Sequence, residues 1–363
     1  MDYYNQIQEL ESELSTTKYN KKTQYHVGLV KAKIAKLKEK EITRGKGKGG
    51  GDGYAVRKSG DATVILIGFP SSGKSTLLND LTDANSPVGA YEFTTLKVIP
   101  GMLRYKQANI QILDVPGIIR GAALGKGRGK EVLAVMQNAD LALLLVDVLR
   151  PQALDVLKKE VYDANIRLSQ RKPDVKIIKK VRGGIKIGKN VPLTWLTDEM
   201  IKGILNEFRL NNADIVIREN ISVDQLIDVI EDNKIYIPGI VVLNKMDLVD
   251  EQKLRQLMAD IKPDLCVSAE KKLNTEKLND LIFDKLQFMR IYCKEISGKP
   301  DLEEPLVLRK SATLKSMCER LHKDFVTKFK YARMWSKHSK VPGQKIVKIN
   351  HALHDEDIVE LHT

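Results

Sequence analysis

Gly68-Phe69-Pro70-Ser71-Ser72-Gly73-Lys74-Ser75 is the stretch that decides the fold of this 363-residue chain. It has the pattern G-x-x-x-x-G-K-S, which forms a loop whose backbone N–H groups converge on phosphate oxygens. An apolar run at 62–67 precedes it and a helical run at 76–81 follows it, so the loop joins a strand to a helix. We therefore predict an α/β domain that binds a nucleoside triphosphate.

Residues of this loop have distinct expected roles. We expect Lys74 to reach the β and γ phosphates and to act in catalysis, and Ser75 to give an oxygen ligand to Mg²⁺. Glycines let the backbone approach the phosphates closely. The other residues of the loop that we predict to bind the nucleotide are Gly68, Pro70, Ser71, Ser72, Gly73 and Thr76.

Two further segments are candidates for sensing the terminal phosphate. Asp114-Val115-Pro116-Gly117 ends the buried run at 110–115, which delivers a carboxylate to the carboxyl edge of the sheet, where ligands bind. We predict that Asp114 anchors Mg²⁺ and that the Gly117 N–H meets the γ-phosphate. In Tyr91-Glu92-Phe93-Thr94-Thr95 we favour Thr95 over Thr94 as a metal ligand and catalytic residue. A threonine pair that merely begins a strand is the alternative.

Asn244-Lys245-Met246-Asp247 predicts which base is bound. A carboxylate at Asp247 can accept hydrogen bonds from guanine N1–H and the exocyclic amine, whereas adenine would leave this acceptor unpaired. Lys245 can lay its alkyl stem over the ring, and Asn244 can tie this loop to the phosphate loop. The backbone of Ser268, Ala269 and Glu270 can present N–H groups to guanine O6. The nucleotide is therefore predicted to be GTP or GDP, and an ATP-dependent enzyme is disfavoured.

Apolar runs alternate with helical segments in the middle of the chain, which predicts a mostly parallel sheet with flanking helices. The predicted strands lie at 62–67, 103–105, 110–115, 141–146, 240–243 and 264–267. Residues 147–239 separate two of these strands, although one crossover unit needs only about 30 residues. We therefore predict a small inserted α/β domain. It holds a helix near 198–207, a strand at 213–217 and a helix that begins at a Ser222–Gln225 capping box.

Both ends of the chain lie outside this sheet. The apolar residues Ile7, Leu10 and Leu14, and then Val27, Val30, Ile34 and Leu37, repeat at helical spacing and predict a helical hairpin. The glycine-rich segment 44–53 reads as a linker. Near the carboxyl terminus we predict a helix at about 313–327 and strand-like runs at 346–349 and 358–361.

Composition excludes several classes of protein. Hydrophobic residues make up 42% and charged residues 29%, as in ordinary globular proteins, and there is no apolar run long enough to span a membrane. The three cysteines show no C-x-x-C spacing, which argues against a disulfide scaffold. We expect a cytosolic protein that does not bind membranes, and a monomer, although the sequence does not fix the oligomeric state.

The net charge of +13 is concentrated in a few segments. Residues 1–58 and 305–363 each carry an excess of six positive charges, and residues 171–190 hold eight positive groups and one negative. Concentrated positive charge is typical of proteins with a polyanionic partner. The predicted second helix carries five lysines, which form either a solvated face or a nucleic-acid surface: Lys31, Lys33, Lys36, Lys38 and Lys40.

The ordered set GFPSSGKST, YEFTT, DVPG, NKMD and SAE, with GIIRGAALGKGRGKEVLA after DVPG, resembles the developmentally regulated GTP-binding (DRG) family of the Obg-related GTPase superfamily. The resemblance covers nearly the whole chain. It implies a P-loop GTPase domain with an N-terminal helical hairpin, an insert like the second domain of a small-subunit ribosomal protein, and a C-terminal TGS domain of β-grasp type. We place the hairpin and linker at 1–60, the GTPase domain at 61–166 and 237–296, the insert at 167–236 and the TGS domain at 297–363.

The resemblance also implies a Mg²⁺-dependent GTP hydrolase associated with translating ribosomes, with a dedicated protein partner for the TGS domain as a further possibility. Ile118 stands where many small GTPases carry a water-orienting glutamine, so we predict slow hydrolysis that a partner or a monovalent cation accelerates. Ser71 stands where potassium-dependent relatives usually have asparagine, so activation by K⁺ stays open. Arg120 and Arg128 are candidates for internal arginine fingers or for solvated or RNA-facing residues. The alternative function is a constitutive RNA-binding or ribosome-binding adaptor that keeps GTP as a structural ligand.

Overall fold

The computed structural model describes residues 3–18, 20, 23–44, 60–82, 99–114, 138–339 and 341–363. These residues divide into two compact units. The first unit comprises the described residues within 3–44 and 158–237, and the second comprises those within 60–114, 138–157 and 238–363.

A six-stranded sheet in the order β11-β10-β4-β1-β3-β2 forms the centre of the second unit. Its strands are β1 (Ala62–Ile67), β2 (Ile99–Tyr105), β3 (Ala108–Asp114), β4 (Leu141–Asp147), β10 (Gly239–Asn244) and β11 (Leu265–Cys266). All neighbouring pairs are parallel except β2 and β3, which confirms the mostly parallel sheet. The carboxyl ends of β1, β3, β4 and β10 therefore meet at one edge.

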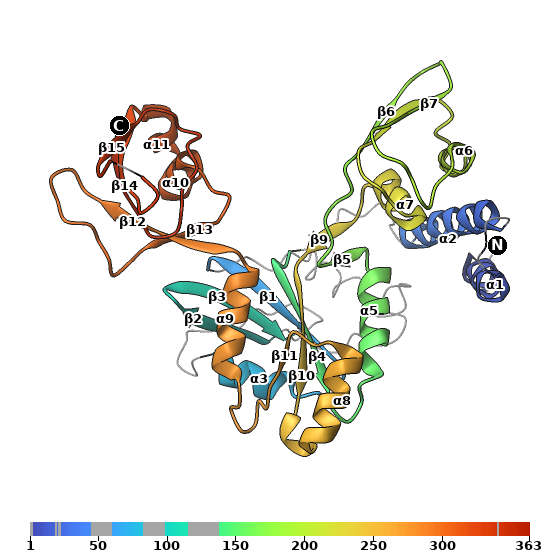
Figure 1. Cartoon of the computed structure of the whole chain (residues 1–363), viewed down its shortest axis with the longest axis horizontal. Coiled ribbons are helices and arrows are strands. Elements are labelled where there is room, and N and C mark those ends of the chain that lie inside the picture. The colour runs from blue at the N-terminus through green and yellow to red at the C-terminus, as the bar shows by residue number, and fades with distance from the viewer. Residues whose placement is uncertain are drawn as a thin grey trace. The chain divides into compact units, whose positions relative to one another are not determined.

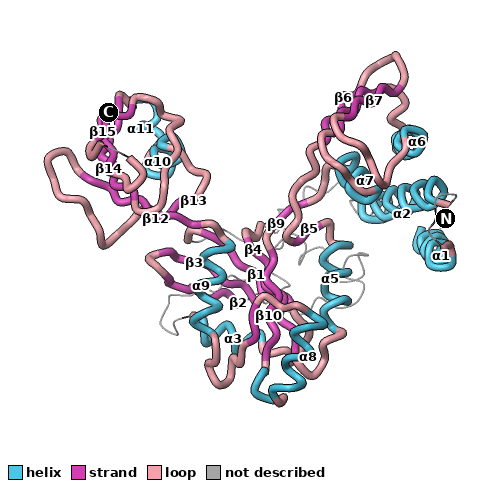
Figure 2. The backbone as a smooth tube through the Cα atoms, in the orientation of Figure 1, coloured by secondary structure: helices cyan, strands magenta, loops and turns pink. Residues whose placement is uncertain are grey.

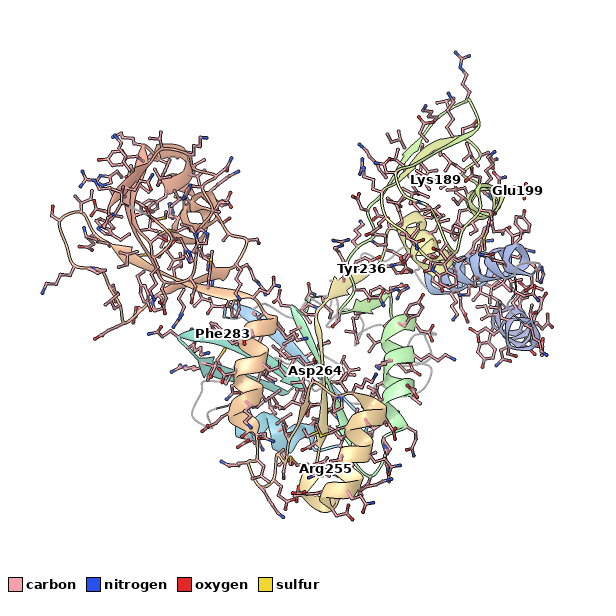
Figure 3. The ribbon with its side chains drawn as sticks, viewed as in Figure 1. Lys189, Glu199, Tyr236, Arg255, Asp264 and Phe283 are labelled. Atoms are coloured by element: carbon pink, nitrogen blue, oxygen red, sulfur yellow. The ribbon has the colours of Figure 1, made fainter. Side chains whose placement is uncertain are left out.

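Helices flank this sheet because both of its faces are apolar. On one face, α3 (Lys74–Leu81) and α9 (Thr275–Lys285) pack Leu77, Leu78 and Ile282 against the strands, while α5 (Ala153–Asp163) and α8 (Glu251–Ile261) lie on the other side (Figure 1). Phe283 on α9, labelled in Figure 3, packs edge-to-face on Phe288 with a centroid separation of 5.6 Å. Continuous burial of β1 and β4 is typical of central parallel strands.

The carboxyl-terminal part of the second unit contains its own five-stranded sheet in the order β13-β12-β16-β14-β15. Its elements are β12 (Phe288–Lys294), β13 (Leu306–Arg309), α10 (Leu314–Leu321), α11 (Lys323–Lys328), β14 (Tyr331–Trp335), β15 (Gln344–Ile346) and β16 (Asp357–His362). Met289, Ile291, Met317 and Val359 belong to its buried core.

Three expectations for this region are corrected. The domain begins at Phe288 rather than at 297, because β12 pairs with both β13 and β16 and is needed to complete the sheet. The single helix expected at 313–327 is two helices, since His322 has an extended backbone with φ −166°. The strand-like run at 346–349 is also shifted, because β15 ends at Ile346.

Two ion pairs attach this small domain to the larger sheet. Arg320 Nη2 lies 2.8 Å from Asp61 Oδ1, and Arg309 Nη2 lies 3.0 Å from Asp140 Oδ1. Asp61 and Asp140 immediately precede β1 and β4. The attachment is therefore at the amino edge of the sheet.

The first unit begins with the predicted helical hairpin. Helices α1 (Tyr3–Thr16) and α2 (Gln24–Arg44) pack through Ile7, Val30 and Ile34. The insert that follows contains β6 (Val175–Lys179), β7 (Ile185–Lys189), α6 (Asp198–Glu207), β8 (Ala213–Ile217) and α7 (Val223–Glu231). Short strands at the two ends of the insert, β5 (Ile166–Leu168) and β9 (Ile235–Ile237), pair in parallel.

The insert is a three-stranded sheet, ordered β6-β8-β7, with helices on one face (Figure 2). Its α6, β8 and α7 match the expected elements, and the Ser222–Gln225 capping box is present. We had expected 171–190 to be only a basic segment, whereas it forms two strands, β6 and β7. Each strand alternates aliphatic residues that face the helices with residues that face solvent.

Helix α2 packs against the insert as well as against α1. Ala32 is fully buried in the same cluster as Met200 and Ile204 of α6. Lys31 Nζ lies 2.7 Å from Asp224 Oδ2, and Lys36 Nζ lies 3.2 Å from Glu207 Oε1. Three of the five lysines of α2, Lys31, Lys36 and Lys38, thus form ion pairs within the first unit, whereas Lys33 and Lys40 are exposed. The structure favours an internal role over an RNA contact for these three lysines.

Among the described residues, no helix is both long enough and apolar enough to cross a membrane.

Candidate functional site

The phosphate loop lies between β1 and α3 at the carboxyl edge of the larger sheet. Gly73 has φ +92°, and a Cβ atom there would lie 2.3 Å from Asn244 Nδ2. A Cβ atom on Gly68 would lie 2.7 Å from the carbonyl oxygen of Leu145. The loop therefore needs glycine at both positions, at Gly73 for its backbone angle and at both for close packing.

Lys74 folds back over the phosphate loop. Its side chain is buried, and Nζ donates to the carbonyl oxygens of Gly68 at 3.1 Å and Phe69 at 3.2 Å. Burial lowers the pKa of Lys74, while the nearby Asp114 carboxylate acts in the opposite direction. An ammonium group held by two neutral carbonyls can exchange them for phosphate oxygens, which carry full negative charge.

Ser75 and Asp114 come together from two different elements. Ser75 Oγ at the start of α3 donates to Asp114 Oδ2 at the end of β3, at 3.0 Å. Asp114 Oδ1 is buried and has no hydrogen-bond partner among the described residues. A buried carboxylate oxygen without a partner is costly unless a cation or water satisfies it. The hydroxyl and carboxylate are hard oxygen donors, so the pair fits Mg²⁺.

Asn244 joins three loops through one side-chain amide. It is almost fully buried, its Nδ2 donates to the Ser72 carbonyl oxygen at 2.9 Å, and its Oδ1 accepts from the Ala269 N–H at 3.1 Å. These contacts link the predicted base-binding loops to the phosphate loop. The expected tie between Asn244 and the phosphate loop is thus present.

Lys245 extends across the edge of the phosphate loop. Its Nζ donates to the Ser71 carbonyl oxygen and to Asp147 Oδ2, both at 2.7 Å. We did not predict Asp147, although it ends a buried strand in the same way as Asp114 does. The extended lysine leaves its alkyl stem as a platform between Ser71 and Asp147.

Asp247 is held in its ionised form. Hydrogen bonding to Ser268 and the neighbouring Lys271 lower the pKa of Asp247, and Lys271 Nζ lies 3.4 Å from its Oδ2. An ionised carboxylate only accepts hydrogen bonds, so it suits the N1–H and amine edge of guanine. Lys271 was also missed by the sequence reading, because a lysine one residue past the Ser268–Glu270 segment carries no distinctive pattern.

The Ser268–Glu270 segment lies beside the same loops. Ser268 is fully buried, and its Oγ accepts from the Lys271 N–H at 3.1 Å. Because the Ala269 N–H already donates to Asn244, contact of this segment with guanine O6 stays a prediction. Pro70 and Thr76 lie in the phosphate loop and in the first turn of α3.

Several predicted site residues lie outside the described part of the chain. They are Thr95 and Gly117, together with Thr94, Ile118, Arg120 and Arg128. Their roles stay predictions.

Three family models match successive parts of this chain. Residues 63–180 match a family described as "50S ribosome-binding GTPase", residues 182–288 match the family described as the C-terminal region of that domain, and residues 289–363 match the TGS domain. The TGS match begins one residue after the start of β12, in agreement with the corrected boundary.

Relatives match over nearly the full length of the chain. A GTP-binding protein of Methanocaldococcus jannaschii is 52% identical over 98% of this chain and 92% of its own length. Developmentally-regulated GTP-binding protein 1 of Xenopus laevis is 43% identical over 98% of this chain and 97% of its own. The chain belongs to the DRG family. Protein 2 of the same family from Homo sapiens is 39% identical over 99% of both chains.

Membership of the DRG family confirms that the chain is a GTP-binding GTPase with a TGS domain. The site therefore binds a guanine nucleotide, for which GTPases usually require Mg²⁺. Lys74 and the Ser75–Asp114 pair stay the residues predicted to bind the phosphates and Mg²⁺, and the Asn244–Asp247 loop stays the predicted base-binding loop.

Proposed function

We propose that this DRG-family GTPase is a Mg²⁺-dependent molecular switch of the cytoplasm that hydrolyses GTP slowly and attaches to ribosomes as a monomer. The observation that carries the proposal is the Asn244 amide, which bonds to the phosphate loop and to the loop at Ala269. Because Asn244 links the two loops, a nucleotide that contacts one of them would also act on the other. The match to a family described as "50S ribosome-binding GTPase" supports the ribosome as the partner.

The described residues bind and orient the nucleotide. Lys74 would leave the Gly68 and Phe69 carbonyls for the β and γ phosphates, and Asp247 would accept from the guanine edge. Mg²⁺ held by Ser75 and Asp114 would offset charge on the phosphate oxygens. Thr95 and Gly117 are proposed to contact the metal and the γ-phosphate respectively.

Slow hydrolysis follows from the aliphatic residue after the D-x-x-G glycine. Ile118 has no polar group with which to orient the attacking water, so a partner or a monovalent cation must complete the site. K⁺ is a candidate, with the Ser71 hydroxyl as a weak ligand. A protein partner at the TGS domain is another proposed element of regulation.

The test is ribosome co-sedimentation with GDP, with a non-hydrolysable GTP analogue and without nucleotide. We expect attachment to differ about tenfold or more between nucleotide states, and this difference to disappear in Lys74→Ala and Ser75→Asn, which lose phosphate or metal contacts. Lys277→Ala, which removes an exposed lysine from α9, is the matched control and should behave like the native chain.

Equal attachment in all three nucleotide conditions, retained in Lys74→Ala, would instead support the adaptor with GTP as a structural ligand. Turnover in KCl and NaCl with the protein alone provides a second check. Fast hydrolysis without any stimulation would contradict the slow switch.

A further inference from the structure

The basic segment of the insert divides into paired and unpaired cations. Four of its positive side chains have acidic partners: Arg171 with Glu219, Lys172 with Asp232, Lys180 with Asp214, and Lys189 with Asp198. Figure 3 labels Lys189 in the strand region of the insert, where its Nζ lies 2.6 Å from the Asp198 carboxylate. Within the described residues, the cations of this segment that are exposed and form no ion pair are Lys176, Lys179, Arg182 and Lys186.

Two of these unpaired cations share one face of the sheet. Lys176 on β6 is opposite Val216, and Lys186 on β7 is opposite Asp214, on either side of the central strand β8. Asp214 and Val216 lie two residues apart and are more exposed than their buried neighbours, so both lysines project from the solvent face. Strand spacing places the two lysines roughly 12 Å apart, far enough to contact separate phosphates.

Asp214 does not neutralise this face, because Lys180 pairs with it. The surface therefore keeps the charge of Lys176 and Lys186. Ile178 on the same face is 46% exposed, and the helices of the insert pack only on the opposite face.

The other two unpaired cations lie at or next to the turn that joins β6 to β7. Lys179 ends β6 and Arg182 follows Val181, which is 96% exposed, and the turn ends with Gly183 at φ +110° and Gly184 at φ +71°. No described atom lies within 4 Å of a Cβ built on either glycine, so the turn projects from the rest of the insert. An exposed valine between two cations contributes nothing to the core of the unit.

We infer that segment 175–189, which comprises β6 and β7 on either side of β8 and the turn that joins them, docks on the phosphate backbone of double-helical RNA. This inference rests on the proposed ribosome-associated function and names the surface that makes the contact. Unpaired cations spread over a flat strand face and a projecting turn suit a row of phosphates. Segment 175–189 contains no aromatic residue, so it lacks the stacking platform that single-stranded RNA binders use.

The test measures binding to a fluorescent RNA duplex of about 20 base pairs, and to one of its single strands, between 50 and 200 mM salt. Four phosphate contacts give a slope near −3.6 in log affinity against log salt, or roughly 150-fold over this range. The test variant carries Lys176→Gln, Lys179→Gln, Arg182→Gln and Lys186→Gln. We expect it to lose most of this slope and roughly 50-fold or more in duplex affinity at 50 mM salt.

The matched control removes the same number of positive charges from exposed lysines elsewhere. It carries Lys158→Gln, Lys159→Gln, Lys262→Gln and Lys277→Gln. We expect its duplex affinity to stay within about threefold of the native chain. Equal losses in the two variants would show that bulk charge, rather than segment 175–189, binds RNA and would overturn the inference.

Two other outcomes would also overturn it. Tighter binding of the single strand than of the duplex would exclude double-helical RNA as the target. Unchanged duplex affinity together with lost ribosome co-sedimentation in the four-residue variant would identify an acidic protein surface instead. Failure of the native chain to attach to ribosomes, with duplex binding intact, would contradict the proposed function but leave the RNA contact of segment 175–189 supported.

Discussion

Helix α2 and segment 175–189 look alike in sequence, since both alternate lysine with aliphatic residues, yet the structure uses their cations in opposite ways. On α2, Lys31 and Lys36 pair with acids of the insert, and Lys38 pairs with Glu11 and Asp163. Burial lowers the pKa of Lys38, but these two carboxylates outweigh it and raise the pKa overall. Segment 175–189 keeps four cations without acidic partners among the described residues. Positive charge in a sequence therefore indicates a polyanionic partner only where the fold leaves it unpaired.

The largest contrast should appear between a buried and an exposed ion pair of the same unit. Arg167 forms a bidentate pair with Asp228 at 2.6 Å, and both side chains are buried, whereas Arg171 pairs with Glu219 while 84% of its side chain stays exposed. Arg167→Ala should lower the free energy of unfolding by about 3–5 kcal/mol because Asp228 is left buried without its counter-charge. Arg171→Ala should lower it by at most about 1 kcal/mol.

Urea unfolding followed by Trp195 fluorescence measures this difference, in a Trp335→Phe background so that the signal comes from the first unit. Equal losses of unfolding free energy in Arg167→Ala and Arg171→Ala would show that burial does not decide how much these ion pairs stabilise the unit.

An intermediate effect is expected from the α2 lysines. The triple variant Lys31→Gln, Lys36→Gln and Lys38→Gln should lower the free energy of unfolding of the first unit by roughly 1–3 kcal/mol, since each half-buried pair contributes at most about 1 kcal/mol. Its affinity for an RNA duplex should stay within about threefold of the native value. The four-residue variant of segment 175–189 should do the reverse: it should lose duplex affinity and change the free energy of unfolding by less than about 0.5 kcal/mol. Loss of RNA binding in the α2 variant with stability intact would break the contrast between the two segments.

The smallest effect is expected at the nucleotide site. There the mostly exposed Lys271 faces Asp247, the carboxylate that is predicted to bind guanine. The lowered pKa of Asp247 keeps its carboxylate ionised well below neutral pH. The preference for GDP over ADP should therefore change by less than about twofold between pH 7.5 and pH 5.5. Competition binding at the two pH values measures it, with Asp247→Asn, which relaxes the preference, as the reference. A steep fall toward pH 5.5 would mean that Asp247 gains a proton there.

The central strands were predictable because they are buried on both faces and are therefore apolar along nearly their whole length. β1, β4 and β10 are continuous apolar runs that end in polar loops, and the observed strands begin and end within a residue of the predicted runs. β12 was missed because FMRIYCK mixes apolar and charged residues and needs two partner strands to define it. β6 and β7 were hidden by their charge, although Val175 and Ile177, and Ile185 and Ile187, alternate with the period of a half-buried strand.

The site was predictable where a motif fixes both spacing and chemistry. The structure brings together Ser75 and Asp114, and it places Asn244 against the phosphate loop. Asp147 ends a buried strand as Asp114 does, but its partner Lys245 lies 98 residues later in the chain, and Lys271 carries no distinctive pattern. The partners of the α2 lysines could not be predicted either, because Lys31 pairs with Asp224, which lies 193 residues later in the sequence.

The ion pairs of Asp61 and Asp140 with the TGS domain place that domain and the nucleotide at opposite ends of the same strands. β1 runs from Asp61 to the phosphate loop, and its six residues span about 20 Å. A hydrogen-bonded strand in the middle of a sheet does not stretch, so a displacement at one end is carried to the other as a rigid translation. The length of β1 therefore sets a fixed mechanical separation between the GTP-binding edge and the arginines, Arg309 and Arg320, that hold the TGS domain.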